Sequence, residues 1–179
     1  PIHAAVYAFN FPQTKVLCAD ITTLSGAEIH QAAFPHPKSS SVAARSAIQN
    51  PKSKIQNPSI DLIIGGPPCQ GFSIMGKGCV EDERNNLVFH FCRLVTELQP
   101  RYFVMENVPG MLTKRYAAFL SQLIEKLEQG GYCITQQVQV LDAADFGVPQ
   151  HRRRLFLIGS RVGEIPLTYP KPLNLNKVT

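Results

Sequence analysis

The chain has 179 residues, of which 44% are hydrophobic and 17% charged, which indicates one folded domain and argues against a disordered chain. Its net charge of +5 is weak evidence for nucleic-acid binding. Most of the excess positive charge comes from residues 31–60, which include four basic and no acidic residues. No apolar run reaches the roughly 18–20 residues of a membrane span, so no membrane partner is expected. The five cysteines are scattered without a C-x-x-C, which argues against a disulfide framework or zinc site and favours the cytosol.

The first sixty residues combine a short apolar segment with a polar one. Residues 14–19 (TKVLCA) predict a strand that ends at Asp20. Residues 36–59 are rich in Ser, Pro, Lys and Asn and contain the sequence I-Q-N-P twice. This composition predicts a solvated loop or a low-complexity insertion.

The remaining residues alternate between apolar strands and amphipathic helices. The expected strands are 59–65, 102–105, 132–141 and 154–159. The expected helices are 87–98, which Pro100 ends, and 120–127, which Gly130 and Gly131 close. The loop between the last two strands is too short for a crossover helix, so these strands should be antiparallel. Residues 161–179 form an irregular tail.

This order of elements predicts an α/β sheet with helices on both faces. Right-handed crossovers place the strand-to-helix loops after Gly65 and Met105 on one edge of the sheet, and the final hairpin should turn at the same edge. Three loops are therefore expected to converge where α/β sheets bind ligands.

The first of these loops, GGPPCQGFS at 65–73, carries a candidate nucleophile at Cys69. Two prolines stiffen the chain just before the cysteine, and the flanking glycines let the backbone approach a ligand. A thiol held at the mouth of a sheet can act as a nucleophile if its thiolate is stabilised. The alternative is a buried structural cysteine in a Gly-Pro turn.

The second and third loops carry ionisable side chains. Glu106 directly follows a buried strand, so its carboxyl group is partly desolvated and could donate a proton or hydrogen bond; it could equally accept bonds from the next helix N-terminus. Arg152 and Arg154 should share one face of the last strand, opposite Arg153. They could orient a carboxylate, a phosphate or a base carbonyl, or form an ordinary basic surface patch.

Taken in order, GGPPCQGFS (65–73), MENVPG (105–110) and FGVPQHRRRLFLIG (146–159) closely resemble the DNA cytosine-5-methyltransferases. The match runs from about residue 6 to 160, interrupted by 36–59. The resemblance implies a Rossmann-like, S-adenosylmethionine-dependent methyltransferase sheet, incomplete and ending in an antiparallel hairpin, with 1–179 as one partial catalytic domain. It also implies S-adenosyl-L-methionine as cofactor and duplex DNA with a flipped cytosine as partner.

The resemblance also implies a role for each matching residue. Cys69 would add to C6 of the cytosine, and Glu106 would engage N3 and the exocyclic amine. Arg152 and Arg154 would hold the O2 side of the base. Pro68 would pack against the base and the cofactor. The other implied contacts are Asp20 for the cofactor adenine, or else an ordinary strand-end Asp, and Gln70, Ser73 and Asn107 for the substrate.

The chain also departs from the family pattern. The family's opening strand with its Gly-rich turn, and the target-recognition region that follows the last hairpin, have no counterpart in this sequence. We therefore expect this chain alone to be weakly active or inactive, and a second chain could supply the missing segments. Two alternatives stay open, a tRNA-methylating relative and a non-catalytic module that binds DNA or a partner. The expected location is a prokaryotic cytoplasm, in association with the nucleoid.

Overall fold

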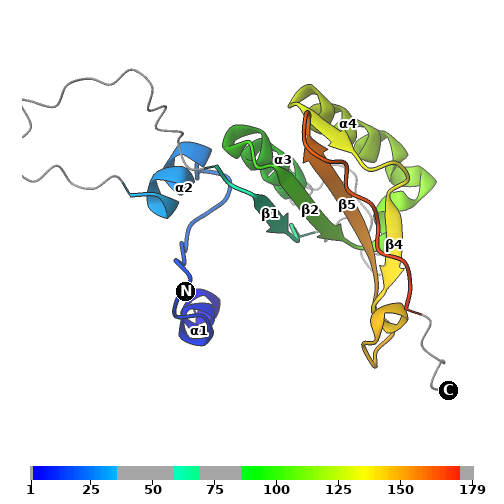
Figure 1. Ribbon diagram of the computed structural model, residues 1–179, viewed down its shortest axis with the longest axis horizontal. Helices are drawn as coiled ribbons and strands as arrows, with labels where there is room; N and C mark the ends of the chain where they lie inside the picture. Colours follow the sequence, from blue (N-terminus) through cyan, green and yellow to red (C-terminus); the bar gives the residue numbers. More distant parts are fainter. Residues whose placement is uncertain (1, 36–58, 69–85, 174–179) are drawn as a thin grey trace, which may run out of the picture. The chain divides into compact units, whose positions relative to one another are not determined.

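The computed structural model describes residues 2–35, 59–68 and 86–173 (Figure 1). The chain divides into two compact units, Pro1–Ser59 and Ile60–Thr179, and each is described by itself. The single catalytic domain expected over 1–179 stays a prediction, and the loop expected over 36–59 lies almost wholly outside the described residues. None of the helices in the described ranges is long and apolar enough to cross a membrane.

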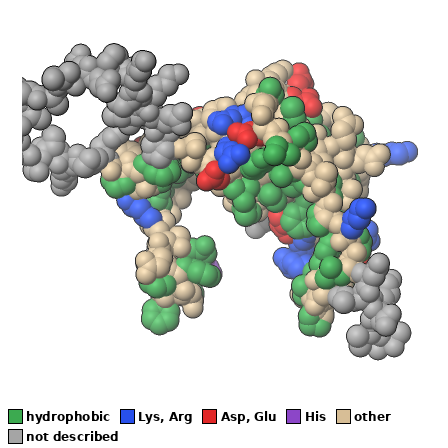
Figure 2. Space-filling view, in the orientation of Figure 1, with side chains coloured by type: hydrophobic (Ala, Val, Ile, Leu, Met, Phe, Trp, Pro, Cys, Tyr) green, Lys and Arg blue, Asp and Glu red, His purple; other side chains and the backbone are tan. Residues whose placement is uncertain are grey.

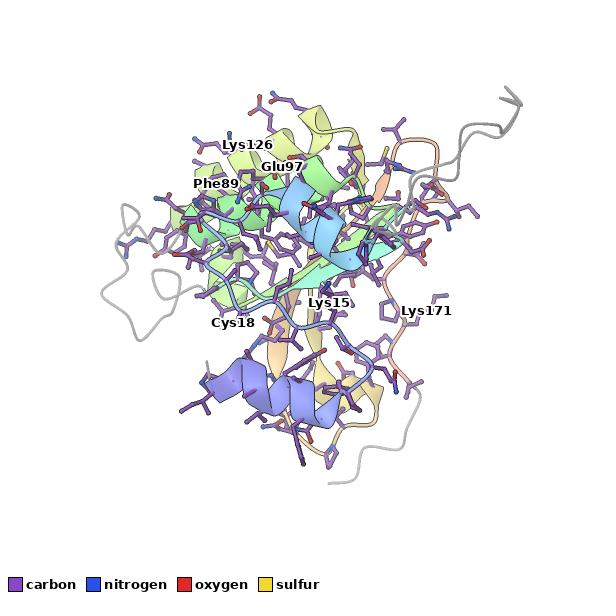
Figure 3. All side chains as sticks on the ribbon, turned by 90° about the vertical axis from the view of Figure 1, so that its left-hand side faces the viewer. Lys15, Cys18, Phe89, Glu97, Lys126 and Lys171 are labelled. Atoms are coloured by element: carbon purple, nitrogen blue, oxygen red, sulfur yellow. The ribbon has the colours of Figure 1, made fainter. Side chains whose placement is uncertain are left out.

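The first unit contains two short helices, α1 (Ile2–Asn10) and α2 (Gly26–Ala33). A capping box begins α2, because Ser25 Oγ accepts the Glu28 N–H and the Glu28 carboxylate accepts the Ser25 N–H. At the other end of α2, Lys15 Nζ donates to the Ala32 carbonyl at 2.6 Å (Lys15 is labelled in Figure 3). The strand expected over 14–19 is wrong: these residues have no regular structure, since no described strand pairs with them.

The second unit is built on one mixed sheet. Its strands are β1 (Leu62–Gly65), β2 (Tyr102–Asn107), β3 (Tyr132–Ile134), β4 (Gln139–Asp142) and β5 (Arg153–Arg161). The order is β1-β2-β5-β3, with β4 also paired to β5. β1 and β2 are parallel, whereas β5 runs antiparallel to β2, β3 and β4 (Figure 1). The expected antiparallel hairpin is confirmed. The single strand expected over 132–141 is two strands, separated by Gln137 in a left-handed conformation with φ 59°.

Two helices of this unit, α3 (Asn86–Leu98) and α4 (Ala117–Gln129), pack together on one face of the sheet. Both end as expected, α3 before Pro100 and α4 at Gly130, followed by Gly131 with φ 91°. Lys126 on α4 lies over the ring of Phe89 on α3, 5.8 Å from its centroid (Figure 3). Helices were expected on both faces, but neither of the two α-helices described in this unit lies on the other face of the sheet. It holds a cavity instead.

The core lies between the sheet and these helices, with Phe103 of β2 at its centre. Phe103 is fully buried, and its ring meets Phe91 of α3 at 6.5 Å and Tyr132 of β3 at 5.4 Å between centroids. A Cβ on Gly159 of β5 would come within 2.5 Å of this ring, so only glycine fits beneath it. Because side chains alternate along a strand, packing of Phe103 toward the helices sends Glu106 to the opposite face.

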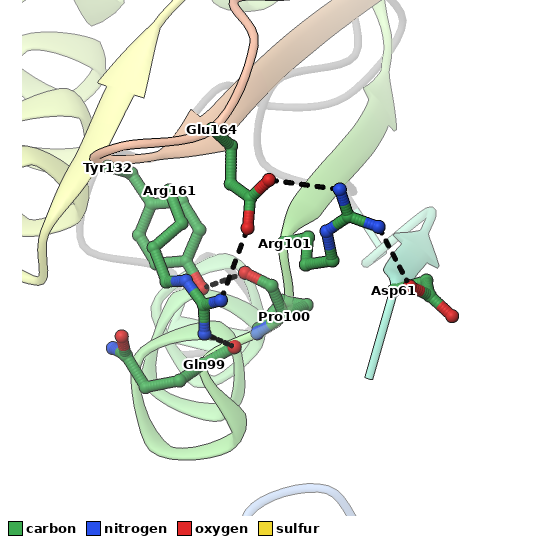
Figure 4. A network of polar contacts seen from close by, with 7 residues as sticks. All are labelled: Asp61, Gln99, Pro100, Arg101, Tyr132, Arg161 and Glu164. Atoms are coloured by element: carbon green, nitrogen blue, oxygen red, sulfur yellow. Dashed lines mark hydrogen bonds and ion pairs between the residues drawn. The ribbon is translucent and has the colours of Figure 1, made fainter. Parts of the chain in front are cut away.

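A network of ion pairs joins the strands at the end of the sheet opposite the three loops (Figure 4). Arg101 pairs with Asp61 at 3.3 Å and with Glu164 at 3.1 Å, and Arg161 pairs with Glu164 at 3.3 Å. Arg161 also donates to the Gln99 carbonyl at 2.8 Å. Acidic and basic side chains stand next to one another there in Figure 2. The network links the segments that enter β1 and β2 to the segment that leaves β5.

This network predicts a loss of stability in acid. Hydrogen bonds from Arg101, and then the charges of Arg101 and Arg161, hold the pKa of Glu164 below its ordinary value of 4.5. A carboxylate with a lowered pKa in the folded state stabilises the fold above its unfolded pKa and loses that contribution as pH falls through the folded one. Urea unfolding measures the free energy of unfolding of wild type and of Glu164→Gln. The difference between the two free energies should be constant from pH 7 to pH 5 and should shrink below about pH 4.5. A difference independent of pH would contradict the assignment.

Candidate active site

The three loops singled out in the sequence meet at one end of the sheet. In the ladder, Gly65 of β1 lies opposite Met105 of β2. Asn107 lies opposite Leu155, and Asp142 lies opposite Arg153. The ends of β1, β2 and β4 therefore reach the same edge as the beginning of β5, which is the convergence that right-handed crossovers predict.

The second and third loops are joined by an ion pair. Arg154 Nε lies 2.8 Å from Glu106 Oε1, and both side chains are about one-third exposed (27% and 33%). The other carboxylate oxygen of Glu106 lies against the first loop, where a Cβ on Gly66 would be only 3.3 Å away. Glycine at position 66 thus lets the first loop approach the carboxylate closely. The pair places a negative and a positive group side by side at the edge of the sheet.

Asn107 joins the first and second loops. Its side chain is buried (1% exposed), and Nδ2 donates to the Pro67 carbonyl at 3.3 Å. Its Oδ1 accepts the N–H of Val108 at 2.9 Å. The substrate contact expected of Asn107 stays a prediction. Its hydrogen bonds give it a structural part that the sequence analysis missed, namely holding the loop that leads to Cys69 beside the loop of Glu106.

Replacing Asn107 with alanine should therefore destabilise the protein. The change leaves the Val108 N–H and the Pro67 carbonyl without this partner, and losing buried hydrogen bonds of this kind costs about 1–3 kcal/mol. Urea unfolding followed by circular dichroism measures the loss. Gln129→Ala, which removes one exposed hydrogen bond to Glu125, is the matched control and should change the unfolding free energy by less than about 0.5 kcal/mol. Equal effects of the two changes would disprove the role of Asn107.

Arg152 and Arg154 line one cavity of about 540 Å³, together with Glu106. Arg153 does not line it, as strand alternation predicts. Arg154 is held by Glu106 and also donates to the Arg153 carbonyl at 2.8 Å. The guanidinium of Arg152, in contrast, has no hydrogen-bond or ion-pair partner among the described residues. A guanidinium in this position is available to a ligand.

The rest of the cavity is largely apolar. Val104, Phe156 and Ile158 of the central strands form its floor, on the face of the sheet away from α3 and α4. Residues 167–170 of the tail form one wall, and the Tyr169 hydroxyl donates to the Phe156 carbonyl at 2.7 Å. Burial raises the pKa of Tyr169. Residues 162–173 are irregular, and the sequence analysis missed that 167–170 line the cavity, because no periodic pattern marks them.

The remaining candidates lie elsewhere or outside the described residues. Cys69, Gln70 and Ser73 fall outside the described ranges, so their roles stay predictions. Pro68 is exposed directly before them, at the end of the loop that follows β1. Asp20 belongs to the first unit, where its Oδ1 accepts the Thr22 N–H at 2.9 Å and the Thr22 hydroxyl at 2.8 Å. The described ranges contain no group of His, Cys, Asp and Glu side chains that could hold a metal ion.

Comparison with known proteins identifies the family. The family model of C-5 cytosine-specific DNA methylases matches residues 3–177. The type II methyltransferase M.XorII of Xanthomonas oryzae is 42% identical over 96% of this chain, and M.AquIA of Picosynechococcus is 38% identical over 91% of it. A solved structure, a candidate DNA modification methyltransferase encoded within an E. coli prophage, is 35% identical with a TM-score of 0.64 and covers 88% of this chain.

The matches cover only part of each of these proteins. The chain spans 36% of M.XorII, 60% of M.AquIA and 37% of the prophage protein. The family model nevertheless covers nearly all of this chain, including the three loops that meet at the edge of the sheet. The chain belongs to the C-5 cytosine-specific DNA methylase family.

Proposed function

We propose that this chain carries the catalytic centre of a DNA (cytosine-5)-methyltransferase, which transfers a methyl group to C5 of a cytosine flipped out of duplex DNA. The observation that carries the proposal is the meeting of the three loops, with Glu106 paired to Arg154 against Gly66 and with Arg152 lining the same cavity. The cavity volume of about 540 Å³ falls within the range typical of small-molecule sites. A protein with this activity would act where the chromosome lies, in the cytoplasm of a prokaryote.

S-adenosyl-L-methionine is the proposed cofactor, and when bound it supplies an electrophilic methyl group. Pro68 and Asp20 are the residues expected to contact it. Both residues are exposed and neither is buried in the core. The Asp20 carboxylate is oriented by the hydrogen bonds that it accepts from Thr22. These features fit a ligand-contacting role for both residues.

In the proposed mechanism each of the converging residues has one task. The thiolate of Cys69 adds to C6 of the cytosine and opens the C5–C6 double bond toward C5. Glu106 engages N3 and the exocyclic amine, which draws electron density from C6 and helps the addition. Arg152 and Arg154 hold the O2 side of the ring through charged hydrogen bonds. After C5 is methylated, loss of its proton and of the Cys69 thiolate restores the aromatic ring.

The test is transfer of labelled methyl from S-adenosylmethionine to duplex DNA, with bulk tRNA as a second substrate and Cys69→Ala as a matched variant. Label in DNA that Cys69→Ala abolishes would support the proposal. Label in tRNA but not in DNA would replace it with a tRNA-methylating function. DNA binding with no transfer, and with no bound cofactor in a folded protein, would favour a non-catalytic module or an active site completed by a second chain.

A further inference from the structure

Asp142 lies where the loop between β4 and β5, which carries Arg152, begins. It is the last residue of β4 and lies opposite Arg153, the first residue of β5. Its side chain is mostly buried, with 18% exposed, and points into the loop between these strands. No resemblance or motif singled out this position.

The carboxylate of Asp142 fixes both ends of this loop. Oδ1 accepts the N–H of Arg152 at 2.9 Å and the N–H of Ala144 at 3.2 Å, so one oxygen joins the residue that ends the loop to one that begins it. Oδ2 lies 3.1 Å from His151 Nδ1. Next to these bonds, the Ala143 N–H donates to the Arg152 carbonyl at 3.1 Å. Both backbone polar groups of Arg152 are thus held by adjacent residues, Asp142 and Ala143.

We propose that Asp142 is a positioning residue, which fixes the backbone of Arg152 so that the guanidinium enters the cavity beside Arg154 and Glu106. The Arg152 side chain itself has no described partner that could hold it, so its direction depends on its backbone. A displacement of about 1 Å in a group that orients a substrate can cost about a hundredfold in rate. The role given to the guanidinium rests on the proposed function, whereas the control of the Arg152 backbone does not.

The first test measures the backbone directly and needs no activity. Hydrogen exchange of the Arg152 amide, followed by NMR, is compared between wild type, Asp142→Ala and Asp142→Asn. Alanine removes the acceptor, so exchange should accelerate about tenfold or more. Asparagine keeps an acceptor oxygen, so protection should stay near the wild-type level. His151→Ala leaves the Oδ1 bonds in place, so the Arg152 amide should exchange as slowly in this variant as in wild type. Equal exchange in wild type and Asp142→Ala would overturn the proposal.

The second test measures methyl transfer. Asp142→Ala should lower kcat/KM by about a hundredfold, and Asp142→Asn should largely restore it. Asp61→Ala removes an acidic partner of Arg101 at the opposite end of the sheet and should leave kcat/KM unchanged, which controls for a general loss of stability. Full activity of Asp142→Ala would overturn the proposal.

A double variant separates positioning from mere support of the fold. If Asp142 acts through Arg152, adding Asp142→Ala to Arg152→Ala should lower kcat/KM no further than Arg152→Ala alone. Fully additive losses would overturn the proposal. A chain that transfers no methyl even when a second chain supplies the missing segments would count against the proposed function, while the exchange of the Arg152 amide would still decide whether Asp142 positions the loop.

Discussion

Replacing Glu106 with glutamine is expected to lower methyl transfer to DNA by about 10²–10⁴-fold, the usual contribution of a positioned general acid. Glutamine has nearly the same shape, and its amide oxygen can still accept from Arg154 Nε, which lies 2.8 Å from the native carboxylate. It cannot supply an acidic proton to N3 of a cytosine. The free energy of unfolding should change by less than about 1 kcal/mol, because the pair is partly solvated. Initial rates with labelled cofactor and urea unfolding measure the two effects.

The matched control is Glu164→Gln, the same chemical change at the opposite end of the sheet. Glu164 pairs with Arg101 and Arg161, so its loss alters an ion-pair network but none of the three loops. Its variant should transfer methyl at the wild-type rate at neutral pH. If Glu106→Gln also kept that rate, Glu106 would have no part in the chemistry, and its ion pair with Arg154 would be structural.

Replacing Phe103 with alanine is expected to lower the free energy of unfolding by about 3–5 kcal/mol, as for other buried phenylalanines. The ring is fully buried, contacts Phe91 and Tyr132, and lies over Gly159. Its loss leaves a cavity between the sheet and α3, next to Tyr132 of β3. Since folded domains are stable by only about 5–15 kcal/mol, this one change removes a large part of the total. Chemical denaturation followed by circular dichroism gives the difference.

Phe9→Ala is the control for this experiment. Phe9 lies on α1 of the first unit and is 85% exposed, so its removal should change the unfolding free energy by less than about 0.5 kcal/mol. Should Phe103→Ala fail to fold, Phe103→Leu keeps part of the volume and should show a smaller loss. A Phe103→Ala variant within 1 kcal/mol of wild type would mean that the core is not centred on β2, the strand that ends at Glu106 and Asn107.

The sequence by itself determined those features that depend on neighbours along the chain. The apolar residues of 87–98 and 120–127 recur at helical spacing, and Pro100, Gly130 and Gly131 end these helices for local steric reasons. The segments 59–65 and 154–159 are apolar enough to predict strands, and both pair in the sheet. The burial expected of the first is wrong, because Leu62 and Ile64 of β1 are exposed. The capping box of Ser25 and Glu28 is also local and could have predicted α2, which the sequence analysis missed.

Only the tertiary structure decided those features that depend on pairing partners far apart in the chain. Residues 14–19 have the composition of a strand but no described strand to pair with, and 132–141 is interrupted where Gln137 turns the backbone. Burial of Phe103 in the core beside α3 set which face of β2 carries Glu106. The bonds of Asn107 to Pro67 and of Asp142 to Arg152 join residues 40 and 10 positions apart. Motifs named the candidate side chains, but hydrogen bonds and packing fixed the positions of Glu106, Asn107 and the Arg152 backbone, because such contacts leave no periodic pattern in the sequence.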